Sequence, residues 1–171
     1  MQKVIKVRTI KDAKAAEKFA FEALRPGGHM DIGIPIPSLK DQFAWYSWAN
    51  LRRPEQPTFI VQADGKIIAG IFGEPVEKTF DIGESEIQEV IFKPGKESEE
   101  IARNLLSRII KFYIRNKAKQ VHFWILEKNF KKSKFEPWQK IAMDEFGFEF
   151  KDFKRISKWS GKPIYKIEKY F

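Results

Sequence analysis

One segment constrains the fold of this chain more than any other: residues 86–106, with the sequence EIQEVIFKPGKESEEIARNLL. An apolar run that ends at Phe92 is followed by a Pro-Gly-Lys turn, and a helical pattern begins near Ser98. When a strand leads into a helix in this way, the unpaired amides of the first helical turn and the helix dipole favour negative charge beside the turn. The segment therefore predicts a strand–turn–helix unit with a potential anion-binding site.

The composition narrows the class of protein. A chain of 171 residues suits a single domain over residues 1–171 that buries its own core. Cysteine is absent, which excludes disulfides, thiolate zinc sites and a cysteine nucleophile. His29 and His122 lie too far apart for metal-ligand spacing, so we expect no metal site. We find no signal peptide and no apolar run near the roughly 20 residues of a membrane span, and we therefore expect a cytoplasmic protein. Abundant Lys, Glu and Ile are typical of thermophiles.

The net charge of +9 is unevenly distributed. Residues 1–110 carry 16 basic and 16 acidic side chains, whereas residues 111–171 carry 16 basic and 7 acidic ones. One interpretation is a lysine-rich, solvated surface. The other is attraction of a polyanion, either the phosphates of a nucleotide cofactor or a nucleic acid.

Hydrophobic periodicity and turn residues predict the remaining elements. Strands are expected at residues 4–8, 58–62, 66–71, 76–80, 86–92, 120–126, 148–153 and 163–170. Helices are expected from Thr9 to about Leu24, from Ser38 to Arg53, from near Ser98 onward, and from a cap formed by Ser133 and Glu136 to Gly147. Asp64-Gly65 predicts a tight hairpin, and the helix after Ser98 is the connection that a parallel strand pair needs. The predicted fold class is α/β (α+β): a twisted mixed, largely antiparallel sheet flanked by about four helices.

This order of elements resembles that of the GNAT superfamily of N-acyltransferases over nearly the whole chain. FIVQADGKIIAGIFG is similar to the second and third strands of that family, EVIFKP to the fourth strand entering its turn, and FGFEF to the end of the last helix. The resemblance implies acetyl-CoA as cosubstrate and transfer of its acetyl group to an unidentified primary amine.

The resemblance also implies where the cofactor binds. The family's pyrophosphate signature, Q/R-x-x-G-x-G/A, falls on residues 97–102, where only Ala102 matches. Glu97 replaces the usual Gln or Arg and Glu100 replaces the first glycine, which adds bulk and like charge near a phosphate. Acidic residues in a first helical turn also have a purely structural explanation, because they complement the helix dipole. The implied cofactor-binding residues are Val90, Ile91, Phe92, Lys93, Lys96, Ile101, Ala102, Arg103 and Asn129.

For catalysis the resemblance points to the fourth strand. Backbone amides around residues 90–92 would stabilise the oxyanion, and Glu89 or Glu86 would act as the base, directly or through water. Either glutamate could instead be an ordinary surface carboxylate. Many family members carry a tyrosine as general acid before the last helix ends, but here that position is Met143, which cannot donate a proton.

The acceptor side is implied by the second helix and the loop before it. Four aromatic residues within positions 43–48 cannot all face one side of a helix, so Trp45 or Trp48 is expected to line a cleft or a partner interface. The expected substrate-binding residues are Trp45, Trp48 and His29 from the preceding loop.

Two alternatives to an enzyme stay open. One is a binding module that kept the GNAT fold and lost catalysis. The other is a basic nucleic-acid-binding protein that uses lysines of the last third with Trp138, Phe153 and Trp159 for stacking. We expect at most weak nucleic-acid binding, no membrane partner and a possible homodimer.

Overall fold

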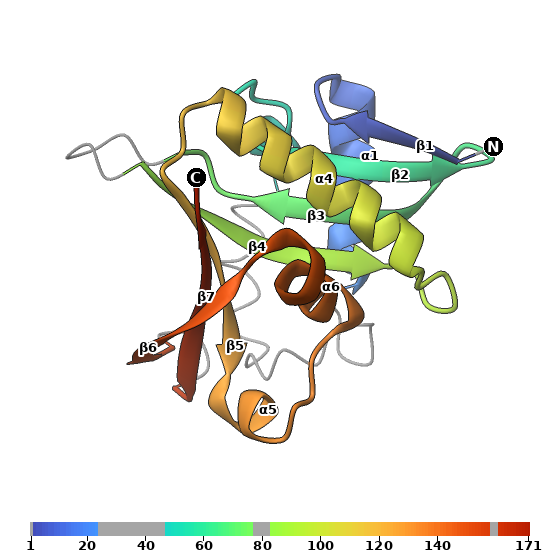
Figure 1. Cartoon of the computed structure of the whole chain (residues 1–171). Helices are drawn as coiled ribbons and strands as arrows, with labels where there is room; N and C mark the ends of the chain where they lie inside the picture. Colours follow the sequence, from blue (N-terminus) through green and yellow to red (C-terminus); the bar gives the residue numbers. More distant parts are fainter. Residues whose placement is uncertain (1, 24–46, 77–82, 158–160) are drawn as a thin grey trace.

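A computed structural model of the chain describes residues 2–23, 47–76, 83–157 and 161–171 (Figure 1). Within these residues, seven strands form one sheet in the order β1-β2-β3-β4-β5-β7-β6. The strands are β1 (Gln2–Lys6), β2 (Thr58–Ala63), β3 (Lys66–Gly73), β4 (Glu84–Phe92), β5 (Gln120–Leu126), β6 (Glu149–Ile156) and β7 (Pro163–Tyr170). The helices are α1 (Ile10–Ala23), α3 (Trp48–Leu51), α4 (Glu99–Arg115), α5 (Glu127–Lys131) and α6 (Pro137–Phe146).

The sheet is mixed, as the sequence predicts. Neighbouring strands pair antiparallel except for β4 and β5, which run parallel and are connected by α4. A helical crossover is the connection that a parallel pair requires. At the opposite edge from β1 lies β6, whose eight residues are all exposed.

Helices cover both faces of the sheet (Figure 1). On one face α4 and α6 pack over the larger hydrophobic core, because Ile101, Leu105 and Ile109 recur at helical spacing and turn one apolar stripe of α4 inward. On the other face α1 and α3 pack over a smaller core. None of the described helices is long and apolar enough to span a membrane.

Several predicted elements are confirmed in detail. Asp64 and Gly65 both have positive φ, 50° and 74°, and connect β2 to β3 in a tight hairpin. Ser98 caps α4, and its side chain accepts a hydrogen bond from the Ile101 amide. Gly147 ends α6 in the left-handed conformation with φ 70°.

Other predictions are wrong or fall outside the described residues. Val76 is not in a strand, because β3 ends at Gly73. Ser133 does not cap α6; that cap is Glu136, which forms a capping box with Gln139 and is followed by a proline at the first helical position. Helix α5 was not predicted. Of the second predicted helix, the structure describes α3, and residues 77–80 of the predicted strand 76–80 lie outside the described range.

Candidate active site

The strands β4 and β5 separate part of the way along their length. Their parallel pairing covers only Glu84 to Glu86 on β4 and Gln120 to His122 on β5, and beyond it the two strands diverge (Figure 1). Successive amides of a strand alternate between its two neighbours. Half of the backbone polar groups of residues 87–92 therefore face the side from which β5 has departed.

A buried tyrosine fixes the point of separation. The hydroxyl of Tyr113 on α4 lies 2.9 Å from the carbonyl oxygen of Glu86 and 3.1 Å from that of Glu74. The Glu74 amide also donates to the Glu86 carbonyl, at 2.8 Å. A Cβ atom at Gly73 would lie 2.3 Å from the Tyr113 hydroxyl oxygen. Glycine at this position is what allows the phenol to reach the strand backbone.

A β-bulge lies between this point and the end of β4. Phe72 of β3 pairs with Glu89 and Gly73 pairs with Ile87, which leaves Gln88 as an extra residue on β4. The bulge explains why Ile87 and Val90, three residues apart, both face the larger core. Bulges redirect side chains and are common beside active sites.

Glu89, directly after the bulge, has unusual electrostatics. Burial raises the pKa of its carboxyl well above the ordinary value of 4.5, and the carboxylates of Glu136 and Glu86 raise that pKa further. Glu136 is the N-cap of α6, so residues far apart in sequence act on the same carboxyl. The shift favours the protonated form of Glu89, which can donate a proton.

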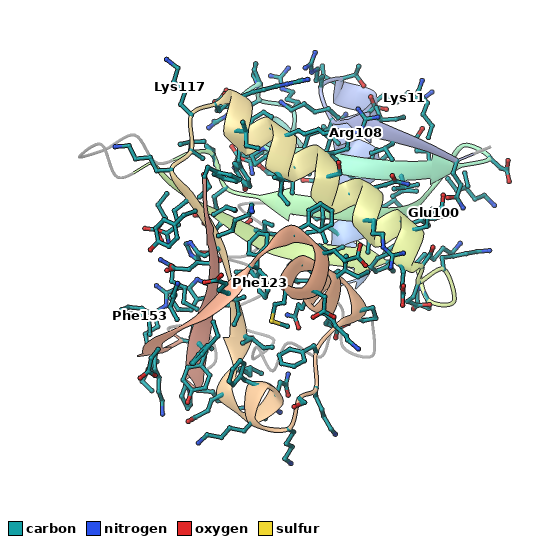
Figure 2. All side chains as sticks on the ribbon, in the orientation of Figure 1. Lys11, Glu100, Arg108, Lys117, Phe123 and Phe153 are labelled. Atoms are coloured by element: carbon teal, nitrogen blue, oxygen red, sulfur yellow. The ribbon has the colours of Figure 1, made fainter. Side chains whose placement is uncertain are left out.

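The turn after β4 and the start of α4 have the geometry of an anion site. The turn is closed by a hydrogen bond of 2.9 Å from the Lys96 amide to the Lys93 carbonyl, and both lysine side chains are exposed. The amides of Glu99 and Glu100 have no acceptor within the helix, because they belong to its first turn. Figure 2 shows Glu100 at this end of α4. Its carboxylate, like that of Glu99, adds negative charge to the same place.

Arg103 joins the two helices on this face. Its guanidinium lies 2.8 Å from Glu99 one turn earlier and 2.8 Å from Glu145 of α6. Hydrogen bonds to Glu145 and Glu99 raise the pKa of the guanidinium and keep it charged. The side chain therefore ties α4 to α6.

Comparison with known proteins identifies this architecture. No family model matches the chain, and no curated protein matches it. Among solved structures, the PaiA N-acetyltransferase from Thermoplasma acidophilum in complex with coenzyme A is similar at 15% sequence identity and a TM-score of 0.65, over 100% of this chain and 99% of that chain. A putative acetyltransferase of the GNAT family from Desulfovibrio desulfuricans is similar at 9% identity and a TM-score of 0.68, over 99% of both chains. YncA, a putative acetyltransferase from Salmonella typhimurium with its cofactor acetyl-CoA, is similar at 15% identity and a TM-score of 0.62, over 99% of this chain and 94% of that chain. The chain has the GNAT fold.

Within the GNAT fold, the predicted cofactor residues divide into two groups. The side chains of Val90, Ile91 and Phe92 are buried in the cores, and so are those of Ile101 and Ala102. These residues can offer a ligand only backbone groups. The other predicted residues present polar side chains: Lys93 and Lys96 at the turn, Arg103 between its two carboxylates, and Asn129 on α5.

Met143 lies on α6 and packs against the larger core, where it cannot replace the expected proton donor.

On the acceptor side, Trp48 is the first residue of α3. Trp45 and His29 lie outside the described residues.

Sequence reasoning missed a polar group on the face of the sheet that Glu86 occupies. The Trp124 indole donates to the Glu86 carboxylate at 3.1 Å, and His122 Nε2 lies 3.3 Å from the same oxygen. The alternation of β5 could have indicated that His122 and Trp124 share a face, because the residues that alternate with them, Val121, Phe123 and Ile125, are buried in the larger core. Figure 2 shows Phe123 in the interior, close to α6.

Proposed function

We propose that this chain is an acetyl-CoA-dependent N-acetyltransferase that transfers an acetyl group to a primary amine. One observation carries the proposal: β4 loses its parallel partner after Glu86, carries a bulge, Glu89 and backbone polar groups not paired with β5 along the rest of its length, and then leads into the helix start of α4. Neighbours with the same fold support it, since one was solved with coenzyme A and another with acetyl-CoA.

The residues around β4 fit an extended ligand that ends in phosphates. Backbone groups of residues 87–92 would pair with an amide-containing arm, as a neighbouring strand does. The amides of Glu99 and Glu100 would receive phosphate oxygens. Lys93 and Lys96 would offset part of the repulsion from the nearby carboxylates.

The acceptor amine loses two protons in the reaction. An ammonium group loses the first before its nitrogen attacks the thioester carbon, and it loses the second as the C–N bond forms and the C–S bond breaks. The sulfur takes up one proton, and solvent receives the other. Amides of residues 90–92 would stabilise the oxyanion during the attack.

The two candidate carboxyls suit different steps. The environment of Glu89 favours its protonated form, so Glu89 would donate to the departing sulfur in place of the missing tyrosine. The Glu86 side chain accepts a hydrogen bond from the Trp124 indole and would receive a proton of the amine.

The test uses the full chain, acetyl-CoA and a panel of primary amines, with released thiol as the readout. The chain contains no cysteine, so every thiol detected belongs to coenzyme A. We expect turnover with at least one amine. Glu89→Gln should lower kcat by roughly 100-fold while acetyl-CoA binding, measured by calorimetry, is retained. Failure of the wild-type chain to bind acetyl-CoA would overturn the proposal.

A catalytically silent GNAT-fold binding module is the second candidate. It is favoured by the carboxylates of Glu99 and Glu100 in the first turn of α4 and by methionine at position 143. Binding of acetyl-CoA without release of thiol toward any amine in the panel would select this candidate.

A further inference from the structure

A buried histidine lies between two carboxylates beside the point where β4 and β5 separate. His122 is only 6% exposed. Its Nδ1 lies 3.1 Å from a Glu84 oxygen and its Nε2 lies 3.3 Å from Oε2 of Glu86. The backbone dictates this placement: Glu84 and Glu86 alternate onto one face of β4, and His122 is the register partner of Glu86 on β5.

One donor holds the Glu86 carboxylate: the Trp124 indole nitrogen donates to Oε2 at 3.1 Å, the same oxygen that His122 Nε2 approaches at 3.3 Å. Within the described residues, Oε1 receives no hydrogen bond, so it is the oxygen that can face an acceptor amine. Trp124 is itself fixed, because the Arg155 guanidinium lies 3.7 Å from its ring centroid and Phe153 packs 6.0 Å away.

Charged residues of β7 lie beside Glu84, on the side of the imidazole that carries Nδ1. Lys166 contacts the same Glu84 oxygen as His122 and lies 3.2 Å from Glu168. Glu168 is the register partner of His122 on β7 and accepts hydrogen bonds from Gln120 and Tyr170. The charged groups around the imidazole are thus Glu84 and Glu86 from β4, Lys166 and Glu168 from β7, and Arg155 of β6 through Trp124.

We propose that His122 is a positioning residue for Glu86: lying between the carboxylates of Glu84 and Glu86, it keeps the Glu86 carboxylate oriented toward the acceptor amine. This inference rests on the proposed function. Nε2 lies within hydrogen-bonding distance of Glu86 and can donate to it when that nitrogen carries the proton, because a neutral imidazole has a single N–H. Among the described residues Nδ1 has no hydrogen-bond partner, although a Glu84 oxygen lies 3.1 Å away.

The direct test of the contact does not depend on activity. The chain has two histidines, so imidazole NMR of the His29→Gln variant reports on His122 alone. We expect a proton on Nε2, the nitrogen that faces Glu86, and a change in the Nε2 chemical shift in Glu86→Gln, because that substitution replaces the neighbouring carboxylate by an amide. An Nε2 without a proton, or an Nε2 chemical shift unchanged by Glu86→Gln, would overturn the inference whatever the enzyme does.

The second test separates a positioning role from a structural one. His122→Leu should lower kcat by about 10- to 100-fold and leave the KM for acetyl-CoA little changed. His122→Gln, which can still donate to Glu86, should retain more activity. Tyr170→Phe is the matched control, because it removes a hydrogen bond within the same polar group without contacting Glu86.

The outcomes distinguish the two proposals. A chain that turns over, in which His122→Leu does not change kcat, would overturn this inference and leave the proposed function intact. A wild-type chain without turnover would overturn the proposed function, and with it the positioning role of His122 in catalysis, even if NMR finds the expected proton on Nε2.

Discussion

Tyr113 donates its hydroxyl to the carbonyl oxygen of Glu86, at 2.9 Å, so helix α4 holds β4 at the last residue that pairs with β5. The phenol is completely buried. Burial raises the pKa of that phenol well above its ordinary value, and the carboxylates of Glu74 and Glu86 add to the effect, which keeps the donor protonated.

Tyr113→Phe should lower the free energy of unfolding by about 1 kcal/mol, because it removes the hydroxyl and keeps the packing of the ring. Urea unfolding of the variant and the wild type measures this difference. Tyr170→Phe is the control, since Tyr170 is 60% exposed and its loss should change stability little. Equal stability of Tyr113→Phe and wild type would show that the hydroxyl does not anchor β4.

Gly73→Ala should destabilise the chain by more than Tyr113→Phe does. The new Cβ would lie 2.3 Å from the Tyr113 hydroxyl oxygen, 2.8 Å from Ile109 and 3.0 Å from the Glu86 carbonyl. Because the nearest atom is the hydroxyl, the cost of Gly73→Ala should be smaller in a Tyr113→Phe background. A double-mutant cycle measures this coupling, and strict additivity would contradict the clash.

Replacing Glu97 by Gln and Glu100 by Gly should tighten coenzyme A binding. The double variant removes two like charges from the turn and the first turn of α4, and it opens the backbone at position 100. A gain of roughly 10-fold corresponds to about 1.4 kcal/mol and is measurable by calorimetry. Glu22→Gln, an exposed site on α1, controls for net charge. An unchanged or weaker affinity would show that phosphates do not bind at this helix start.

Glu89 should make stability fall as pH rises. In the unfolded chain its carboxyl ionises near the ordinary pKa of 4.5, whereas in the folded chain it keeps its proton to higher pH. The contribution to stability is therefore fully present below pH 4.5 and is lost as the pH rises through the folded pKa. Glu89→Gln removes this dependence, so its stability relative to wild type should increase from acidic to neutral pH. Urea unfolding at several pH values measures the free energy of unfolding of both proteins. A constant difference between Glu89→Gln and wild type across these pH values would contradict the prediction.

Nucleic-acid binding should be weak and lost by about 150 mM salt. Part of the basic last third is already paired: Lys131 and Lys154 lie 2.8 and 3.0 Å from Glu127, and their hydrogen bonds lower the pKa of Glu127 to about 2. Fluorescence anisotropy with DNA and RNA at two salt concentrations measures the effect. Sub-micromolar binding that survives at the higher salt would favour a nucleic-acid-binding protein over an enzyme.

Local sequence signals predicted most of the fold. The Asp64-Gly65 hairpin, the Ser98 cap and the Gly147 stop each depend on residues close in the chain, and each is confirmed. Ser133 misled the prediction because a serine before a helical pattern resembles a cap, whereas the capping box of Glu136 and Gln139 determines the actual start.

The candidate site was predictable only in part. The sequence predicted Glu86 and Glu89 as candidate bases from their place on the fourth strand of the GNAT pattern, but it could not tell the two apart. The pKa of Glu89 is raised by burial and by Glu136, which lies on another element. The partners of His122 come from β4 and β7, and only the register of three strands brings them together. Such long-range register is not encoded in any local pattern.

The length of helix α4 matches that of the separated part of β4. The helix holds β4 through Tyr113 near one end and begins at Glu99 at the other, and these residues are separated by about 21 Å at the rise of an α-helix. From Glu86 to Phe92, β4 covers about 20 Å at the rise of a strand. The two lengths agree, so a ligand bound as proposed, from the helix start to the point where β4 and β5 separate, would have to match a fixed span. Adding or removing one turn of α4 would change that span.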